Sequence, residues 1–226
     1  MKHLTIGVFG LQGDIEEHMA MTKLALDKMR LDGAVIWAKT EKDVECLDGL
    51  IIPGGESTVI GRLADYNKTL KAIKERIYDG MPVLGTCAGL IMLAKKVYDR
   101  VVSDVKQPIL GLMDAVAERN AFGRQKESFE VDLQIPAFGK KKFRGVFIRA
   151  PAIREIGPEV EILCKLNETI IAAQQHNMIG TAFHPELTDD TRLHQYFIKT
   201  VKKSRCFPGS DSLPTTTEKL TPLTKA

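Results

Sequence analysis

Cys87 lies at the centre of a glycine-flanked segment, Gly85–Gly89, that reads Gly-Thr-Cys-Ala-Gly. A G-x-C-x-G pattern between a short apolar run and a helical stretch is the cysteine counterpart of a nucleophile elbow, a tight turn that holds a reactive side chain clear of its own backbone. The positive end of the following helix would favour the reactive thiolate. The alternative is a structural thiol in the core, because free cysteine is among the most buried residue types.

A second candidate pair, His184 and Glu186, is separated by Pro185 at the end of an apolar run. In an extended segment, positions i and i+2 point to the same side, so the imidazole and the carboxylate can lie next to each other. A base that serves a thiol needs one ring nitrogen facing the thiol and the other held by an acceptor. The alternative is an exposed strand end with two polar residues. No carboxylate is placed in this way for the other histidines, His3, His18, His176 and His194.

A third candidate segment, Pro53–Ser57, follows the apolar run Gly49–Ile52 and contains Gly54 and Gly55. Two glycines after a strand allow backbone N–H groups to approach a ligand closely, and a following helix adds its dipole. This arrangement suits an oxyanion hole, in which donors are fixed where negative charge develops during acyl transfer. The alternative is an ordinary turn between a strand and a helix, where glycine pairs are common.

These three segments follow predicted strands, and ligands of open parallel sheets bind beyond the carboxyl ends of the strands. Together they supply a nucleophile, a base with its acceptor and an anion site, which are the parts of a thiol acyl-transfer enzyme. The sequence offers no parts of a metal site. Gly7 and Gly10 lack the remaining glycine of a dinucleotide-binding fingerprint.

The first half of the chain alternates strands and helices, which predicts a parallel sheet with helices on both faces. The predicted strands are 4–10, 34–38, 49–52 and 82–86, and the predicted helices are 14–30, 41–46 (a helix or a turn), 58–65, 68–78 and 88–96. Asp14 is a candidate N-cap of the first helix. The fold class is therefore α/β, with a mostly parallel central sheet flanked by helices.

The second half predicts antiparallel strands, added to the same sheet or forming a small second one. They cover 128–135, 143–149, 160–166, 169–175 and 179–183, with tight turns at 167–168 and 176–177, and a helix follows at 191–203. From Ser204 the composition changes to serine, threonine and proline. We therefore expect a single domain over residues 1–203 and a disordered tail over 204–226.

The amino-acid composition argues against several other classes of protein. The 226 residues are 44% hydrophobic and 27% charged with a net charge of +3, which does not favour nucleic acid as a partner. No apolar run is long enough to cross a membrane, and no signal peptide is evident, so we expect a cytoplasmic protein. The four cysteines, Cys46, Cys87, Cys164 and Cys206, form no C-x-x-C pair of a zinc or redox site.

At Gly85–Gly89 and His184–Glu186 the chain resembles the class I, triad-type glutamine amidotransferases, which have a flavodoxin-like fold. Further segments narrow the resemblance to the glutaminase subunits of pyridoxal 5′-phosphate synthase, the PdxT/SNO family. These segments are Gly10–Asp14, Pro53–Thr58, Glu118–Gln125, Phe147–Pro151 and Leu187–Asp190. The likeness extends from about Leu4 to Lys203, and the segment from Ser204 onward has no role in the family pattern.

The resemblance implies that L-glutamine is hydrolysed to L-glutamate and ammonia through a γ-glutamyl thioester. It assigns Cys87 as nucleophile, His184 as base and Glu186 as the residue that orients His184. It places the oxyanion hole at the N–H groups of Gly55 and Ala88. It also implies a glutamine site made by Gly54, Gly55, Glu56, Arg119, Ile148 and Arg149. An arginine suits this role because its planar fork pairs with a carboxylate, whereas the alternative is a surface ion pair.

The resemblance further implies that the ammonia passes to a partner synthase subunit of the PdxS/SNZ type in a hetero-oligomer that makes pyridoxal 5′-phosphate. This chain would then need no metal and no cofactor. We expect the segment Leu11–Asp14 and the helix after it to contribute to the docking face. Two alternatives remain: a glutaminase subunit of another amidotransferase, and a catalytically silent regulatory subunit. Segments 10–14 and 119–125 argue against the first, and the complete triad argues against the second.

Overall fold

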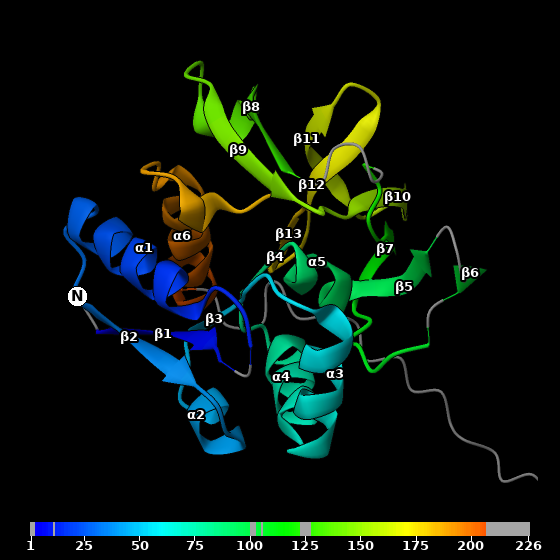
Figure 1. Cartoon of the computed structure of the whole chain (residues 1–226). Coiled ribbons are helices and arrows are strands. Elements are labelled where there is room, and N and C mark those ends of the chain that lie inside the picture. Colours follow the sequence, from blue (N-terminus) through cyan, green and yellow to red (C-terminus); the bar gives the residue numbers. More distant parts are fainter. Residues whose placement is uncertain (1–2, 11, 100–102, 105, 123–127, 207–226) are drawn as a thin grey trace, which may run out of the picture.

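The computed structural model describes residues 3–10, 12–99, 103–104, 106–122 and 128–206, and one mixed sheet runs through it (Figure 1). Its strands follow the order β2-β1-β3-β4-β13-β12-β10-β7-β5-β6, with β11 pairing with β12 off this path, and β8 and β9 form a separate sheet. Strands of the first half are β1 (Leu4–Phe9), β2 (Gly33–Ala38), β3 (Gly49–Ile52) and β4 (Val83–Thr86). Later strands are β5 (Ala94–Asp99), β6 (Ser103–Asp104), β7 (Met113–Glu118), β8 (Ser128–Leu133), β9 (Phe143–Ile148), β10 (Ala152–Ile156), β11 (Glu161–Leu166), β12 (Thr169–Gln175) and β13 (Met178–Thr181).

The parallel part of the sheet positions the candidate site. Strands β2, β1, β3, β4 and β13 are parallel neighbours, so the segments that follow β1, β3, β4 and β13 emerge at the same edge. Strand β13 comes from the second half of the sequence, yet it pairs with β4 in a register that places Thr181 opposite Thr86. This pairing brings the segment before His184 next to the segment that carries Cys87.

Helices cover both faces of the parallel strands, as the alternation of strands and helices predicts. Figure 1 shows α1 and α6 on one side of β1, β2 and β3, and α2, α3 and α4 on the other. The helices are α1 (Ile15–Lys28), α2 (Glu41–Glu45), α3 (Ser57–Tyr66), α4 (Thr69–Tyr78), α5 (Ala88–Leu93) and α6 (Arg192–Cys206), with short 3-10 turns η2 (Pro136–Phe138) and η3 (Pro185–Leu187). Their apolar residues pack with the buried strands into one main core.

The antiparallel strands of the second half take both predicted forms: some extend the main sheet, and two form a small second sheet. Strands β12 and β10 extend the main sheet in the antiparallel sense, while β8 and β9 pair with each other alone. The tight turns at 167–168 and 176–177 are confirmed, because Asn167 and His176 adopt the positive φ values that such turns require. Strands β5, β6, β7 and β10 lie in segments for which the sequence predicted no strand.

Two predicted helix ends are wrong. The helix after Cys87 ends at Leu93 rather than near Lys96, because residues from Ala94 onward pair with β7 as the strand β5. The last helix continues past Lys203 to Cys206. There Ser204 Oγ donates to the carbonyl of Gly80 over 2.7 Å, which anchors the extra turn. The rest of the predicted tail, residues 207–226, lies outside the described residues. Among the described residues, no helix is long and apolar enough to span a bilayer.

Candidate active site

The elbow at Cys87 has the geometry that its sequence predicts. Cys87 follows β4 directly, precedes α5 and adopts φ +49° and ψ −101°, which is a strained conformation for a residue with a side chain. Its N–H donates to the carbonyl of Thr181 over 2.8 Å, which fixes the turn to β13. A Cβ at Gly85 would lie 2.5 Å from the backbone of Gly89, so the two flanking glycines are sterically required.

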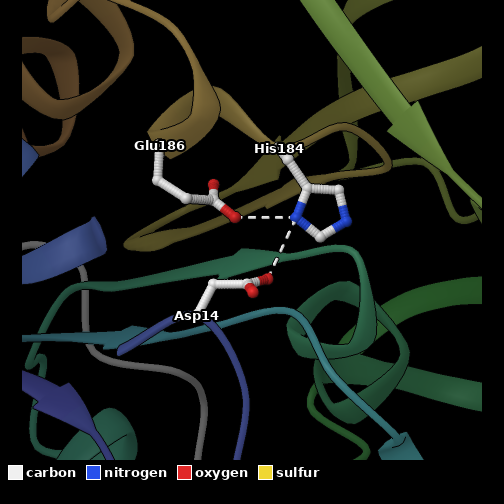
Figure 2. A group of neighbouring side chains, drawn as sticks. All are labelled: Asp14, His184 and Glu186. Atoms are coloured by element: carbon white, nitrogen blue, oxygen red, sulfur yellow. Dashed lines mark hydrogen bonds and ion pairs between the residues drawn. The ribbon is translucent and has the colours of Figure 1, made fainter. Parts of the chain in front are cut away.

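His184 and Glu186 form the predicted pair (Figure 2). Nδ1 of His184 lies 2.7 Å from Oε1 of Glu186, and both side chains are buried. His184 is extended, and Pro185 begins the short turn η3 that returns the carboxylate to the ring. The N–H of His184 also donates to the carbonyl of Val146 over 2.8 Å, so strand β9 helps to hold the segment.

Asp14 also contacts the imidazole, which sequence reasoning did not predict. Its Oδ2 lies 3.3 Å from Nδ1 of His184, so two carboxylates converge on one ring nitrogen (Figure 2). Asp14 is the N-cap residue of α1, as predicted, but its side chain makes no cap hydrogen bond to the helix. Gly54 packs behind the same ring, where a Cβ would lie 2.5 Å from Cε1 of His184.

The pKa values of His184 and Glu186 are shifted by burial and by the charged side chains around them. Burial by itself lowers the pKa of His184, but interactions with Asp14, Cys87 and Glu186 outweigh it and raise that pKa to about 12. Burial by itself raises the pKa of Glu186, but His18 and His184 together bring it well below its usual range. The pair is therefore held as imidazolium and carboxylate, which is the state that supports a neighbouring thiolate.

A cavity of about 390 Å³ opens beside Cys87 and His184. Both residues expected to form the oxyanion hole, Gly55 and Ala88, line it. Of the residues expected to bind glutamine, Gly55, Glu56, Arg119, Ile148 and Arg149 also line it, whereas Gly54 is absent from its wall. The structure therefore brings predicted site residues together that are up to 129 positions apart in the sequence, from Gly55 to His184.

Arg119 and Glu56 form an ion pair on the cavity wall. Nη2 of Arg119 donates to Oε1 of Glu56 over 2.9 Å, and Nη1 reaches Oγ1 of Thr58 over 3.4 Å. The same carboxylate caps helix α3 by accepting from the N–H of Thr58. A neighbouring guanidinium and carboxylate can bind the two opposite charges of an amino acid zwitterion.

Three residues that line the cavity adopt positive φ values although they are not glycine. They are Cys87, Asn120 and Arg149, at +49°, +50° and +41°. Strained backbone of this kind concentrates at functional sites, where the surrounding structure holds it in place. Asn120 belongs to the family segment Glu118–Gln125, of which residues 123–125 lie outside the described part of the chain.

Three site residues were missed by the sequence reasoning or given another role. Gln12 lines the cavity, and its Oε1 accepts from the N–H of Glu56 over 2.8 Å, which supports the glycine loop. Asp14 contacts His184, as described above. His18 lies beside Glu186, which is a carboxylate 168 positions away in the sequence. The local spacing of residues carries no signal for contacts of this range.

Comparison with known proteins agrees with the site. The model of the SNO glutamine amidotransferase family matches residues 8–203. A relative from Nitrosopumilus maritimus, named pyridoxal 5′-phosphate synthase subunit PdxT, is 46% identical over 200 residues, which cover 88% of this chain and 98% of the relative. A relative of the same name from Saccharolobus solfataricus is 48% identical over 199 residues, which cover 88% of this chain and 100% of the relative.

Solved structures point to the same fold. One crystal structure, described as a glutamine amidotransferase, is 42% identical with a TM-score of 0.76, covering 87% of this chain and 98% of its own. A glutamine amidotransferase from Thermotoga maritima is 15% identical with a TM-score of 0.59, covering 92% and 88%, and it shares the fold alone. With the match over residues 8–203 and these relatives, the chain belongs to the SNO glutamine amidotransferase family.

Proposed function

We propose that this chain is the glutaminase subunit of a pyridoxal 5′-phosphate synthase. It hydrolyses L-glutamine to L-glutamate and ammonia and passes the ammonia to a synthase subunit. Its relatives carry the subunit name PdxT, and the family is one of glutamine amidotransferases. The observation that carries the proposal is the convergence of Cys87, a His184–Glu186 pair and a glycine loop on one cavity.

The proposed chemistry begins from the ion pair in which the Cys87 proton already resides on His184, so that the sulfur is a thiolate and the ring an imidazolium. The thiolate attacks the side-chain carbonyl carbon of glutamine, a C–S bond forms, and negative charge moves to the carbonyl oxygen. The N–H groups of Gly55 and Ala88 stabilise that oxyanion. His184 then gives its proton to the nitrogen, the C–N bond breaks, and ammonia leaves a γ-glutamyl thioester. Water, deprotonated by His184, hydrolyses the thioester and releases glutamate.

The wall of the cavity supplies the recognition of substrate in this proposal. Arg119 binds the α-carboxylate of glutamine, and Glu56 binds the α-ammonium, so the Arg119–Glu56 pair opens to admit a zwitterion. Ile148 and Arg149 also line the cavity, and Gly54 leaves space for the ring of His184. Glutamate differs from glutamine at the distal group alone, so selectivity depends on the elbow end of the cavity.

Free ammonia would diffuse away, so the glutaminase needs a partner of the PdxS/SNZ type that consumes it. In this proposal the two subunits form a hetero-oligomer, and the first turn of α1 with the segment 11–14, of which Leu11 lies outside the described residues, contributes to the docking face. Asp14 contacts the catalytic histidine and Gln12 contacts the glycine loop, so docking there can adjust the site. This chain binds no cofactor of its own, because pyridoxal phosphate is the product of the complex.

The test is glutamate production from glutamine, measured with and without an added PdxS-type synthase subunit. We expect synthase-stimulated activity in the wild type and a loss of at least about a thousandfold in Cys87→Ala. Cys164→Ala is the matched control, because it removes another buried thiol that does not line the cavity. Activity that survives Cys87→Ala contradicts the mechanism. Stimulation by the synthase subunit of a different amidotransferase, and not by this one, contradicts the assignment of the partner.

A further inference from the structure

His18 is a fully buried histidine that the proposed chemistry does not use. It lies in the first turns of α1, and its side chain has no exposed surface. Its Nε2 is 3.1 Å from Oε2 of Glu186 and 2.9 Å from Oγ1 of Thr86. Glu186 is the residue that orients His184, and Thr86 immediately precedes Cys87. His18 therefore contacts both the carboxylate of the triad and the strand that ends at the nucleophile.

The second oxygen of Glu186 depends on this contact. Oε1 contacts Nδ1 of His184 at 2.7 Å, whereas Oε2 makes no hydrogen bond among the described residues, and its polar contact is Nε2 of His18 at the ion-pair distance of 3.1 Å. A carboxylate oxygen only accepts hydrogen bonds, and a buried one without a partner is costly. Without the ring of His18, Oε2 would have no polar contact among the residues that the structure describes.

The neighbours of His18 determine which ring nitrogen carries the proton. A lone pair on Nε2 would face the carboxylate at 3.1 Å and repel it, so Nε2 must be the protonated nitrogen. Nδ1 of the same ring is 3.1 Å from Nε2 of His194, another fully buried histidine on α6. His194 can donate to that nitrogen and leave its own Nδ1 as the unpartnered acceptor. Glu186 and His194 are the titratable side chains that contact His18 among the described residues.

We infer that His18 is a positioning residue that extends the triad: the polar contact of its Nε2 with Oε2 of Glu186 orients the carboxylate so that Oε1 faces His184. Its contact with Thr86 fixes the carboxylate relative to the strand that ends at the elbow, and His194 fixes the tautomer of its ring. The inference rests on the proposed function, because positioning is defined here by the glutaminase reaction. It places helix α1 in direct contact with the catalytic carboxylate.

The test compares two amide variants of matched polarity. In His18→Gln the amide nitrogen reaches the position of Nε2 and keeps the donor, whereas in His18→Asn it falls one methylene short. We expect His18→Asn to lower kcat of synthase-stimulated glutamine hydrolysis by about 10- to 100-fold with KM changed by less than about threefold. We expect His18→Gln to stay within about fivefold of wild type. His3→Asn, at a largely exposed ring, is the control and stays unchanged.

The pH profile and the ring tautomer separate positioning from a structural role. Loss of the donor raises the pKa of Glu186, so the acid limb of kcat/KM moves to higher pH in His18→Asn and not in His18→Gln. Nitrogen-15 NMR of the histidine rings in the wild-type chain needs no variant and should show Nε2 of His18 protonated. Equal losses in both amide variants, an unmoved acid limb or an unprotonated Nε2 overturn the inference. If the wild type makes no glutamate, the proposed function fails, while the NMR result still decides the contact.

Discussion

Two cysteines of this chain, Cys87 and Cys164, are buried to nearly the same degree and have opposite surroundings. Their side chains keep 8% and 3% of their surface exposed. Cys87 is held at φ +49° on an elbow, lines a cavity and interacts with His184. Cys164 lies on strand β11, where the register of the pairing with β12 shifts, and its thiol contacts the carbonyls of Gln134 and Lys165 at 3.5 and 3.6 Å.

The difference shows that burial alone does not predict what a thiol does. Burial raises the pKa of Cys164 to about 11, so that thiol stays protonated and inert at neutral pH. Beside Cys87, the imidazolium of His184 is stabilised by two carboxylates, and this positive charge favours a thiolate. Reactivity is therefore set by the histidine and its acceptors, which are distant in sequence, and the elbow sets only where the sulfur points.

The largest effect is expected when the acceptor of that histidine is removed. Glu186→Gln keeps the volume and one oxygen but loses the charge that holds Nδ1 of His184, so kcat should fall by about a thousandfold. The measurement is synthase-stimulated glutaminase activity at saturating glutamine. Glu130→Gln, on the exposed surface of β8, is the control. A loss of less than about tenfold would show that Asp14 can serve as the acceptor on its own.

The same variant makes a prediction about stability and pH. The pKa of Glu186 is lowered on folding, so its contribution to the free energy of unfolding is full above the ordinary value of about 4.5 and is lost as the pH falls through the folded value. The free-energy difference between wild type and Glu186→Gln should therefore shrink on acidification below about pH 4.5. Urea unfolding at several pH values measures it. A difference that grows towards low pH contradicts the assigned charge state.

Alkylation should distinguish the two buried thiols directly. With the exposed Cys46 and Cys206 replaced by alanine, we expect iodoacetamide to modify Cys87 at pH 7 about a hundredfold faster than Cys164. Mass spectrometry of the peptides follows both rates in one sample. His184→Gln should remove most of the preference, because it removes the positive charge beside Cys87. Equal rates in the wild-type background would mean that access, and not charge, governs both thiols.

The substrate-binding wall should change KM more than kcat. Arg119→Met removes the guanidinium proposed to pair with the α-carboxylate, and loss of a charge-assisted hydrogen bond should raise KM for glutamine by about tenfold or more. Arg144→Met is the matched control, because Arg144 pairs with Glu130 and Asp132 on the surface of the separate sheet. A normal KM in Arg119→Met would leave the Arg119–Glu56 pair with a structural role only.

Features that depend on neighbouring residues could be predicted from the sequence, whereas features that depend on distant residues could not. Local patterns sufficed for the elbow, the parallel first half and the His184–Glu186 pair, because each depends on residues within a few positions of one another. They did not suffice for strands β7 and β10, whose place is set by pairing across the sheet. The contacts of Asp14 and His18 with the site were missed for the same reason. Their partners His184 and Glu186 arrive through β13, a strand that the second half inserts beside β4.

The smallest effect is expected at the inert thiol. Cys164→Ala removes a buried sulfur that packs in the main core, so the free energy of unfolding should fall by about 1 kcal/mol while glutaminase activity stays at the wild-type level. Cys164→Ser keeps a donor within reach of the Gln134 carbonyl but buries a more polar group, so it should be no more stable than the alanine variant. Urea unfolding and turnover on the same samples measure both. Lost activity in a folded Cys164→Ala would break the comparison, because it would give the two buried thiols a shared role in catalysis.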